Sequence, residues 1–412
     1  MDEIPIYVIT GWVLLLGGGA VIALLVAQQL GFLRQQKAVH EHEISRLREE
    51  IGIVREERER RKALPAAWNG TRKFRVDQKI PEAGGICSFY LKPHDNKTPL
   101  PPFLPGQFLT FALEIKGKEV VRCYSLSDCH RPDHYRVSIK RVLAPRDKPG
   151  IPPGLVSFHF HDHINEGDIL DVRAPSGGFA LDPQGTGGVV LNGSGVGLTP
   201  VLAMMNHLME SGSRRDIWFF YGVGNGDENM IKDKIKEWRS AGRPNAHVHV
   251  AYSRPNDDEE AGKDYDHKGR VDIELLKNVL PSNNFDFYTC GPGPMMDAIR
   301  EGLGGWGVPE AHIHDEAFMQ VKESVSIEAA TVEWKRSGSI SNIAGEVTSL
   351  LDFADSENIR IPSGCRTGGC GTCQTALISG KVKYPKPPEF KIEDGCCLPC
   401  VCLPDGNIVV DA

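Results

Sequence analysis

Four cysteines in the C-terminal quarter constrain this chain more than any other feature of its sequence. The first three are separated by four and then by two residues, and the fourth lies well downstream: Cys365, Cys370, Cys373 and Cys400. Four thiolates with this spacing hold a [2Fe–2S] cluster. Several glycines in the same loop let the backbone approach an inorganic core closely, namely Gly364, Gly368, Gly369 and Gly371. The sequence therefore predicts a [2Fe–2S] cluster bound by these cysteines.

Other uses of these cysteines fit less well. A zinc site would more often have two Cys-x2-Cys pairs, and the loop holds only one. Disulfides are rare in the cytosol, where a chain with nucleotide-binding motifs is expected. The fourth ligand stays open, because Cys396, Cys397 and Cys402 lie close to Cys400 in the sequence. The alternative role of these neighbours is that of small buried side chains.

The N-terminal segment is apolar. Residues 6–27 carry no charge, and as a helix they would be about 33 Å long, which is enough to span a bilayer. Asp2 and Glu3 stand where a secretory signal would carry basic residues. Arg34 and Lys37 follow the run, which favours a cytoplasmic position for the rest of the chain. We expect residues 1–33 to be a retained single-pass anchor in the inner membrane.

A charge-dense segment, residues 34–67, follows this anchor. Its apolar residues Ile44, Leu47, Ile51 and Val54 are spaced as in a coiled coil, but the pattern is too short to sustain one. We expect a helical stalk that lifts the remaining domains off the bilayer. Homodimerisation through the anchor or the stalk is an open alternative to a monomer. The 412 residues allow about three domains, and the net charge of −7 argues against nucleic-acid binding.

Residues 68–184 show short alternating apolar runs broken by proline and glycine, which predicts an antiparallel β-barrel. A flavin needs a cation near its pyrophosphate, an aromatic surface for its ring and a donor near N5. Arg122, Tyr124 and Ser125 supply these three groups within four residues. Gly154 and Ser157 then open an apparent helix, whose N-terminus is suited to a phosphate. The three alternating histidines of that helix, His159, His161 and His163, resemble a metal site only weakly.

Residues 185–320 read as an α/β domain with a parallel sheet. A buried strand at 189–192 feeds a glycine-rich turn and then a helix, which is the context in which such a turn cradles a phosphate. The turn contains Gly193, Gly195, Gly197 and Thr199. Further strands are predicted at 217–221, 247–251 and 286–290.

Together these segments resemble the ferredoxin-NADP reductase superfamily, and in particular the reductase part of flavohaemoglobins and the reductases of oxygenases. Residues 321–412 resemble a plant-type ferredoxin with a β-grasp fold. The resemblance implies FAD, with FMN as the less favoured alternative. It also implies that Cys290, Gly291 and Pro292 lie beside the nicotinamide, with Glu316 and Phe318 where the last strand meets the flavin ring. Arg122 would hold the pyrophosphate, Tyr124 the isoalloxazine, and Ser125 would lie near N5.

The order of flavin, nicotinamide and ferredoxin domains implies electron flow from a nicotinamide through a flavin and a cluster to a protein acceptor. A membrane oxygenase, hydroxylase or desaturase is the favoured acceptor. A respiratory complex that reduces quinone and a redox-responsive docking or sensor protein are the alternatives. NADH is favoured over NADPH, because the acidic run 257–260 follows Ser253 and Arg254, where a 2′-phosphate would bind.

Overall fold

The computed structural model describes residues 68, 70–144, 152–316, 324–385, 388, 390 and 392–412. The described residues belong to one compact unit, residues 65–412. Within them, no helix is long and apolar enough to cross a membrane. The predicted anchor and stalk lie outside the described residues.

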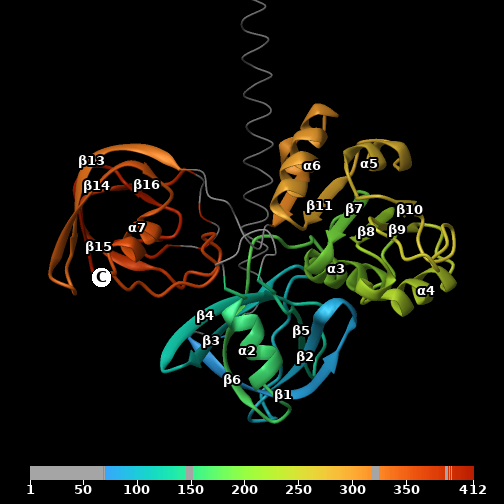
Figure 1. Ribbon diagram of the computed structural model, residues 1–412, viewed down its shortest axis with the longest axis horizontal. Coiled ribbons are helices and arrows are strands. Elements are labelled where there is room, and N and C mark those ends of the chain that lie inside the picture. The colour runs from blue at the N-terminus through green and yellow to red at the C-terminus, as the bar shows by residue number, and fades with distance from the viewer. Residues whose placement is uncertain are drawn as a thin grey trace, which may run out of the picture. The chain divides into compact units, whose positions relative to one another are not determined.

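The first domain is a six-stranded antiparallel β-barrel (Figure 1). Its strands run in the order β4-β3-β6-β1-β2-β5. Their bounds are β1 (Thr71–Pro81), β2 (Ile86–Pro93), β3 (Phe108–Ile115), β4 (Lys118–Ser125), β5 (Tyr135–Lys140) and β6 (Ile169–Ser176). A β-bridge between Leu126 and Val137 links the continuation of β4 to β5, so the two outer strands of the sheet meet. The helix α2 (Leu155–His163) lies across this barrel.

Aromatic side chains fill the barrel beneath α2. Phe160 of that helix is fully buried and makes edge contacts with Phe89, Phe111 and Tyr124 at ring-centroid distances of 5.2 to 5.3 Å. Edge-to-face geometry is favourable between such rings. The packing therefore fixes α2 against the strand that carries Tyr124.

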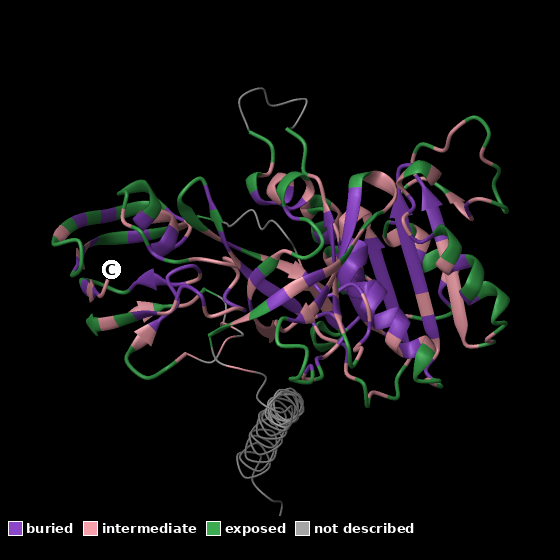
Figure 2. Ribbon diagram, turned by 90° about the horizontal axis from the view of Figure 1, so that it is seen from below, coloured by how far each residue is buried: buried purple, intermediate pink, exposed green. Residues whose placement is uncertain are grey.

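The second domain has a six-stranded parallel sheet in the order β10-β9-β8-β7-β11-β12. Its strands are β7 (Val189–Ser194), β8 (Ile217–Val223), β9 (Ala246–Tyr252), β10 (His267–Lys268), β11 (Asp286–Cys290) and β12 (Ile313–Glu316). Two helices, α3 (Leu198–Glu210) and α4 (Lys232–Ser240), pack on one face, and α5 (Ile273–Val279) and α6 (Gly293–Gly305) pack on the other (Figure 1). The central strands and α3 are mostly buried (Figure 2).

The third domain contains the four predicted cluster cysteines. A five-stranded sheet runs in the order β14-β13-β19-β15-β17, with β19 parallel to β13, and β16 and β18 form a separate pair. The elements are β13 (Val325–Trp334), β14 (Ser339–Val347), α7 (Leu350–Ser356), β15 (Thr375–Ser379), β16 (Val382–Lys383), β17 (Cys396–Cys397), β18 (Leu403–Pro404) and β19 (Ile408–Val410). Trp334 is fully buried in the core, where its Nε1 donates to Ser341 Oγ at 3.1 Å.

The prediction of an antiparallel flavin-type barrel, a parallel α/β domain and a ferredoxin-type domain in this order is confirmed. The predicted strands at 189–192, 217–221, 247–251 and 286–290 all form. The boundaries of the five predicted segments stay predictions.

Candidate functional site

Three strands of the α/β domain end beside one another at a single edge of the sheet. Cys290 of β11 stands in register between Gly193 of β7 and Glu316 of β12. Because the strands are parallel, their carboxyl ends meet at this edge. The strand order reverses at β7, which pairs with β8 on one side and with β11 on the other. Such a switch point is where open α/β sheets bind nucleotides.

The glycine-rich turn after β7 packs directly against the end of β11. A Cβ atom on Gly197 would overlap the carbonyl oxygen of Cys290 and lie 2.7 Å from the Cα of Gly291. A Cβ atom on Gly193 would lie 2.6 Å from Val201 Cγ2. Gly195 has φ of 57°, a left-handed conformation that favours glycine. Gly197 therefore lets the turn and the end of β11 approach more closely than any larger residue would allow.

The helix α3 begins at this turn and directs its N-terminus toward the same edge. Thr199 is buried, and its Oγ1 donates to the carbonyl oxygen of Val196 at 3.0 Å. This bond rigidifies the turn, so Thr199 supports the backbone through its side chain. The first amides of a helix lack acceptors within it and attract phosphate. The turn and α3 are therefore suited to a dinucleotide pyrophosphate.

Cys290 is fully buried, and this burial raises the pKa of its thiol well above the usual value, with the carboxyl groups of Glu316 and Asp315 adding to the effect. The thiol is therefore neutral and offers a small apolar surface. Pro292 is the N-cap of α6, and a Cβ atom on Gly291 would lie 3.1 Å from Met295 Sδ. The structure thus brings Cys290, Gly291 and Glu316 together. The predicted Phe318 lies outside the described residues.

The predicted flavin residues occupy the end of β4. Arg122 is exposed, and its Nη1 donates to the carbonyl oxygen of Val121 at 2.7 Å. Tyr124 is partly buried, and burial raises the pKa of its phenol, so the hydroxyl group stays neutral. Ser125 is buried opposite Phe108 of β3. One strand therefore offers an exposed cation, an aromatic face and a hydroxyl group in sequence.

The predicted phosphate site lies at the N-terminus of α2. The Gly154 amide donates there to the carbonyl oxygen of Val142 at 2.9 Å. The Ser157 hydroxyl group donates to the Gly154 carbonyl oxygen at 2.9 Å and accepts from the Val142 amide at 3.2 Å. Both residues thus fasten the start of the helix to the barrel. The helix amides of residues 155–157 are the groups that can bind an anion there.

The four predicted cluster cysteines lie in two pairs. The Cys370 sulfur accepts from the Cys365 amide at 3.3 Å, and the two thiols are in hydrogen-bond contact. Cys400 makes the same thiol contact with Cys373 and accepts from the backbone of Gly368. Backbone amides of Thr367 and Thr372 also point at the sulfurs of Cys365 and Cys370, at 3.4 and 3.5 Å. Two pairs of thiols surrounded by amides fit a two-iron cluster.

The neighbouring cysteines have other surroundings. Cys397 and Cys402 are fully buried and in contact with each other, and Cys396 starts the short strand β17. Of these cysteines, Cys400 is therefore the one whose thiol contacts a member of the Cys-x4-Cys-x2-Cys loop, Cys373.

The alternating histidines of α2 have protein partners. The rings of His159 and His163 lie 5.2 Å apart, and His161 Nε2 lies 2.8 Å from the carbonyl oxygen of Ile139. Among the described residues, the one group of three potential metal ligands that lies close together is elsewhere. The arrangement of these histidines therefore does not favour a metal site.

One residue near the predicted nucleotide edge was missed in the sequence. Glu228 follows β8, and its Oε1 lies 3.6 Å from Nη2 of Arg254, the residue expected to face a 2′-phosphate. A Cβ atom on Gly224, just after β8, would lie 2.5 Å from the same Oε1. An acidic residue soon after the glycine-rich end of β8 is the signal that could have indicated it.

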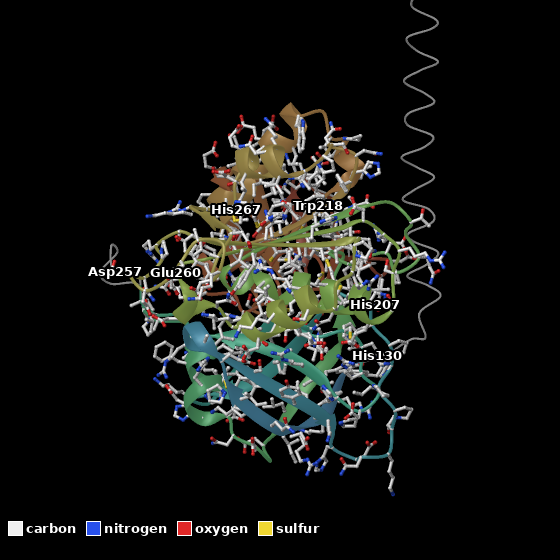
Figure 3. The ribbon with its side chains drawn as sticks, turned by 90° about the vertical axis from the view of Figure 1, so that its right-hand side faces the viewer. His130, His207, Trp218, Asp257, Glu260 and His267 are labelled. Carbon is white, nitrogen blue, oxygen red and sulfur yellow. The ribbon has the colours of Figure 1, made fainter. Side chains whose placement is uncertain are left out.

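The preference for NADH was predicted from the acidic residues 257–260. In the structure, Glu259 of this run binds groups other than Arg254. The Glu259 carboxylate accepts from the amides of Gly226 and Asn256, both at 2.7 Å. Asp257 and Glu260 lie on the outer loop, away from the sheet (Figure 3). Among the described residues, Glu228 is thus the acidic group that pairs with Arg254.

Family models match three consecutive segments of the chain. An oxidoreductase FAD-binding domain covers residues 76–181, an oxidoreductase NAD-binding domain covers 191–301, and a 2Fe-2S iron-sulfur cluster binding domain covers 332–405. The chain is an oxidoreductase. The buried turn, the exposed cation of β4 and the paired thiols fit the three groups that these domains bind.

Similar proteins fall into two groups. The flavohemoproteins of Halalkalibacterium halodurans and Bordetella pertussis are 38% and 40% identical over 256 and 254 residues, which are 62% and 61% of this chain. The chain spans 61% of the length of each of them. Phthalate dioxygenase reductase is 28% identical with a TM-score of 0.51, over 84% of this chain and 98% of that one.

A self-sufficient cytochrome P450 monooxygenase shares the fold, at 23% identity and a TM-score of 0.59, over 83% of this chain and 41% of that one. The chain thus combines NAD-binding, FAD-binding and [2Fe–2S] domains in the manner of an electron-transfer reductase.

Proposed function

We propose that this chain is a membrane-anchored reductase that takes electrons from NADH and passes them through FAD and a [2Fe–2S] cluster to a protein acceptor. One observation carries the proposal: a nucleotide edge, a flavin strand and two thiol pairs occur in one chain, and a reductase that transfers electrons from pyridine nucleotides to a [2Fe–2S] centre matches 84% of it. A flavin supplies the conversion between the two electrons of a nicotinamide and the single electrons of a cluster.

Different residues would bind the nucleotide and the flavin. The turn at Gly193, Gly195 and Gly197 would hold the pyrophosphate of the nucleotide. Cys290 and Glu316 would border the nicotinamide, with the neutral thiol excluding water and charge from that side. Arg122 would meet the flavin pyrophosphate.

The cluster would bind to the two thiol pairs. Cys365 and Cys370 would hold one iron, and Cys373 and Cys400 the other. Two contacts join the cluster loop to the barrel: Arg173 Nη1 donates to Thr372 Oγ1 at 3.4 Å, and Cys370 contacts Cys123. These contacts support direct electron transfer from the flavin strand to the loop.

We favour a membrane oxygenase, hydroxylase or desaturase as the acceptor. The likeness to phthalate dioxygenase reductase supports an oxygenase partner. An anchored donor would also gain effective concentration toward a membrane partner. The uncharged segment 6–27 supports that anchor and a position on the cytoplasmic face of the inner membrane, with dimerisation through the anchor or stalk as an accompanying proposal.

NADH is favoured as the donor by Glu228. Its carboxylate beside Arg254 would repel a 2′-phosphate and can accept a hydrogen bond from a ribose hydroxyl group. Arg254 is already paired, so its charge is partly neutralised before a nucleotide arrives.

Steady-state turnover tests this function. The purified protein should oxidise NADH with ferricyanide and with cytochrome c as acceptors. A regulatory docking protein would show a titratable cluster without sustained turnover. Quinone reduction that exceeds transfer to protein acceptors would support the respiratory alternative.

Deleting residues 1–33 tests the anchor. The truncated protein should move from the membrane fraction to the supernatant, because the apolar run is removed. Its rate of ferricyanide reduction should be unchanged, since every cofactor motif lies after residue 100. Loss of flavin content in the truncated protein would contradict this separation of anchor and chemistry.

A further inference from the structure

A group of polar residues joins the flavin barrel to the nucleotide domain. Asp128 and Arg131 follow β4 directly, three and six residues after Ser125. Asn206 and Glu210 belong to the last turns of α3. Figure 3 labels two neighbours of this group, His130 from the barrel and His207 from α3. We call these four residues, Asp128, Arg131, Asn206 and Glu210, the interdomain latch.

The Arg131 guanidinium binds both carboxylates of the latch through paired contacts. Its Nη1 and Nη2 donate to the two oxygens of Glu210 at 2.7 and 2.6 Å. Its Nε and Nη2 donate to the two oxygens of Asp128 at 3.2 and 3.3 Å. Asn206 Nδ2 donates to Asp128 Oδ1 at 2.8 Å. Paired bonds between a planar guanidinium and carboxylates fix orientation as well as distance.

The latch is more sheltered than an ordinary surface ion pair. The side chain of Asp128 is 13% exposed, and those of Arg131 and Glu210 are 32% and 40% exposed. Cys129 is buried behind them, with Sγ 3.5 Å from Glu210 Oε2. Asp128, Cys129 and Glu210 could approach a metal ion, but the Arg131 guanidinium already donates hydrogen bonds to both carboxylates. The group is therefore an ion-pair contact.

Other contacts between the two domains include a close approach of Gly84, in the turn between β1 and β2, to the backbone of Glu228, together with apolar packing. Phe179 and Leu181, which follow the barrel, pack in the same core as α3, and a Cβ atom on Gly106 would lie 2.6 Å from the terminal methyl group of Met204. Apolar packing favours contact but is not directional. The latch therefore supplies a directional bond between the domains.

We propose that Arg131 is a positioning residue for the nicotinamide. The helix α3 begins at the pyrophosphate turn of Gly197 and Thr199, and its last turn is bound by Arg131. The chain just before Arg131 carries Tyr124 and Ser125. The latch thus sets the distance between the nucleotide turn and the flavin strand. The inference rests on the proposed hydride transfer from NADH to the flavin.

Rapid-mixing reduction of the flavin by NADH tests the latch. Arg131→Met should lower the limiting reduction rate about tenfold, because small misplacements of reacting groups have large effects on rate. The NADH dissociation constant, taken from the concentration dependence, should change less than about twofold, since no latch residue belongs to the nucleotide turn. Arg131→Lys should recover part of the rate. Glu210→Gln weakens the same contact from α3 and serves if Arg131→Met folds poorly.

Alkylation of Cys129 in the cofactor-free protein gives a second readout. Opening the latch should expose this thiol, so Arg131→Met and Glu210→Gln should speed its modification by iodoacetamide, measured by peptide mass spectrometry. Cys87, buried inside the barrel, should react as slowly as in the wild type. Arg239→Met is the matched control, because Arg239 forms a half-exposed pair with Asp266 inside one domain.

Each result of these two measurements either supports or overturns the role of the interdomain latch. Slower flavin reduction together with faster Cys129 modification supports the latch. Unchanged rates in both Arg131→Met and Glu210→Gln, or losses equal to those of Arg239→Met, overturn it. If NADH does not reduce the wild-type flavin, the proposed function fails instead of the latch.

Discussion

The nucleotide site and the cluster site are built in opposite ways. The nucleotide site consists of strand ends and glycine backbone, with Gly197 pressed against Cys290 and Gly291 in the core of the domain. Three cysteines of the cluster site lie in a loop between α7 and β15 without helix or strand of its own, and the fourth, Cys400, lies between β17 and β18. The groups that would bind the cluster are four thiols, which contact one another in pairs.

This difference separates a site that is formed before its ligand from one that depends on it. Close packing of strands and α3 determines the nucleotide edge whether or not a nucleotide is bound. Four thiols gain their main partner only when a metal centre binds, so binding and local folding are coupled. Changes at the two sites should therefore have different consequences for order and for rate.

The largest effect should come from replacing Cys370 with serine. Loss of one thiolate should remove or destabilise the cluster, and NADH-driven cytochrome c reduction should fall more than about 100-fold, since even the loss of a hydrogen-bond partner of a metal ligand costs about 10–100-fold. Reduction of the flavin by NADH should survive. The absorbance of the flavin and the electron paramagnetic resonance of the cluster would measure the two steps. Equal loss of both with flavin retained would contradict the linear path.

A smaller loss should follow Gly197→Ala. The added methyl group would overlap the Cys290 carbonyl oxygen, so the turn or the end of β11 must move. A displacement of about 1 Å can reduce a rate about 100-fold, and we expect flavin reduction by NADH to slow by that order while the cluster remains intact.

Gly304→Ala is the matched control for that substitution, because nothing lies within 4 Å of a Cβ atom at this position of α6. If Gly197→Ala and Gly304→Ala reduce the flavin equally fast, the close approach at Gly197 has no role in binding the nucleotide.

Donor selectivity should respond to Glu228 more than to Arg254. The wild type should show a higher kcat/KM with NADH than with NADPH. Glu228→Gln should raise the NADPH value about tenfold, because it removes a negative charge beside the phosphate position and frees Arg254. Arg254→Ala should leave the NADH value nearly unchanged. A wild-type preference for NADPH that is lost in Arg254→Ala would reverse the assignment.

The smallest effect should be a pH dependence of stability in the nucleotide domain. Burial, with the neighbouring His267, lowers the pKa of His249 to about 4, and its Nδ1 lies 3.1 Å from His267 Nε2. A histidine with a lowered pKa stabilises the fold above its unfolded pKa of about 6.5, and this contribution is lost as the pH falls toward 4.

His249→Gln should reduce that dependence by no more than about 2 kcal/mol, because the ring is partly exposed. Urea midpoints at pH 7.5 and pH 5 would measure it. An identical loss of stability in the wild type and in His249→Gln on acidification would assign the effect to other groups.

The sequence predicted those parts that depend on local spacing. About a dozen consecutive residues are enough to recognise each of three features: the cysteine loop, the turn of Gly193 to Thr199, and the strand that ends at Cys290. Each requires a particular backbone that few other patterns allow.

Contacts between distant residues were not predictable in this way. Arg131 meets Glu210 across 79 residues, and Glu228 meets Arg254 across two elements of the sheet. Their partners are fixed by the packing of α3 and β9. The hydrogen bond from the Gly154 amide to Val142 was not predictable for the same reason, since it depends on how α2 meets the barrel.

The neutral, fully buried thiol of Cys290 affects how well the protein resists oxidation in the presence of oxygen. Reduced flavins and iron–sulfur centres generate peroxide when oxygen reaches them, and peroxide attacks thiolates rather than thiols. A cysteine proposed to border the nicotinamide, with a thiol whose pKa is strongly raised by burial, offers almost no thiolate to this attack. The enzyme should therefore keep its nucleotide site chemically intact through many turnovers that leak electrons to oxygen.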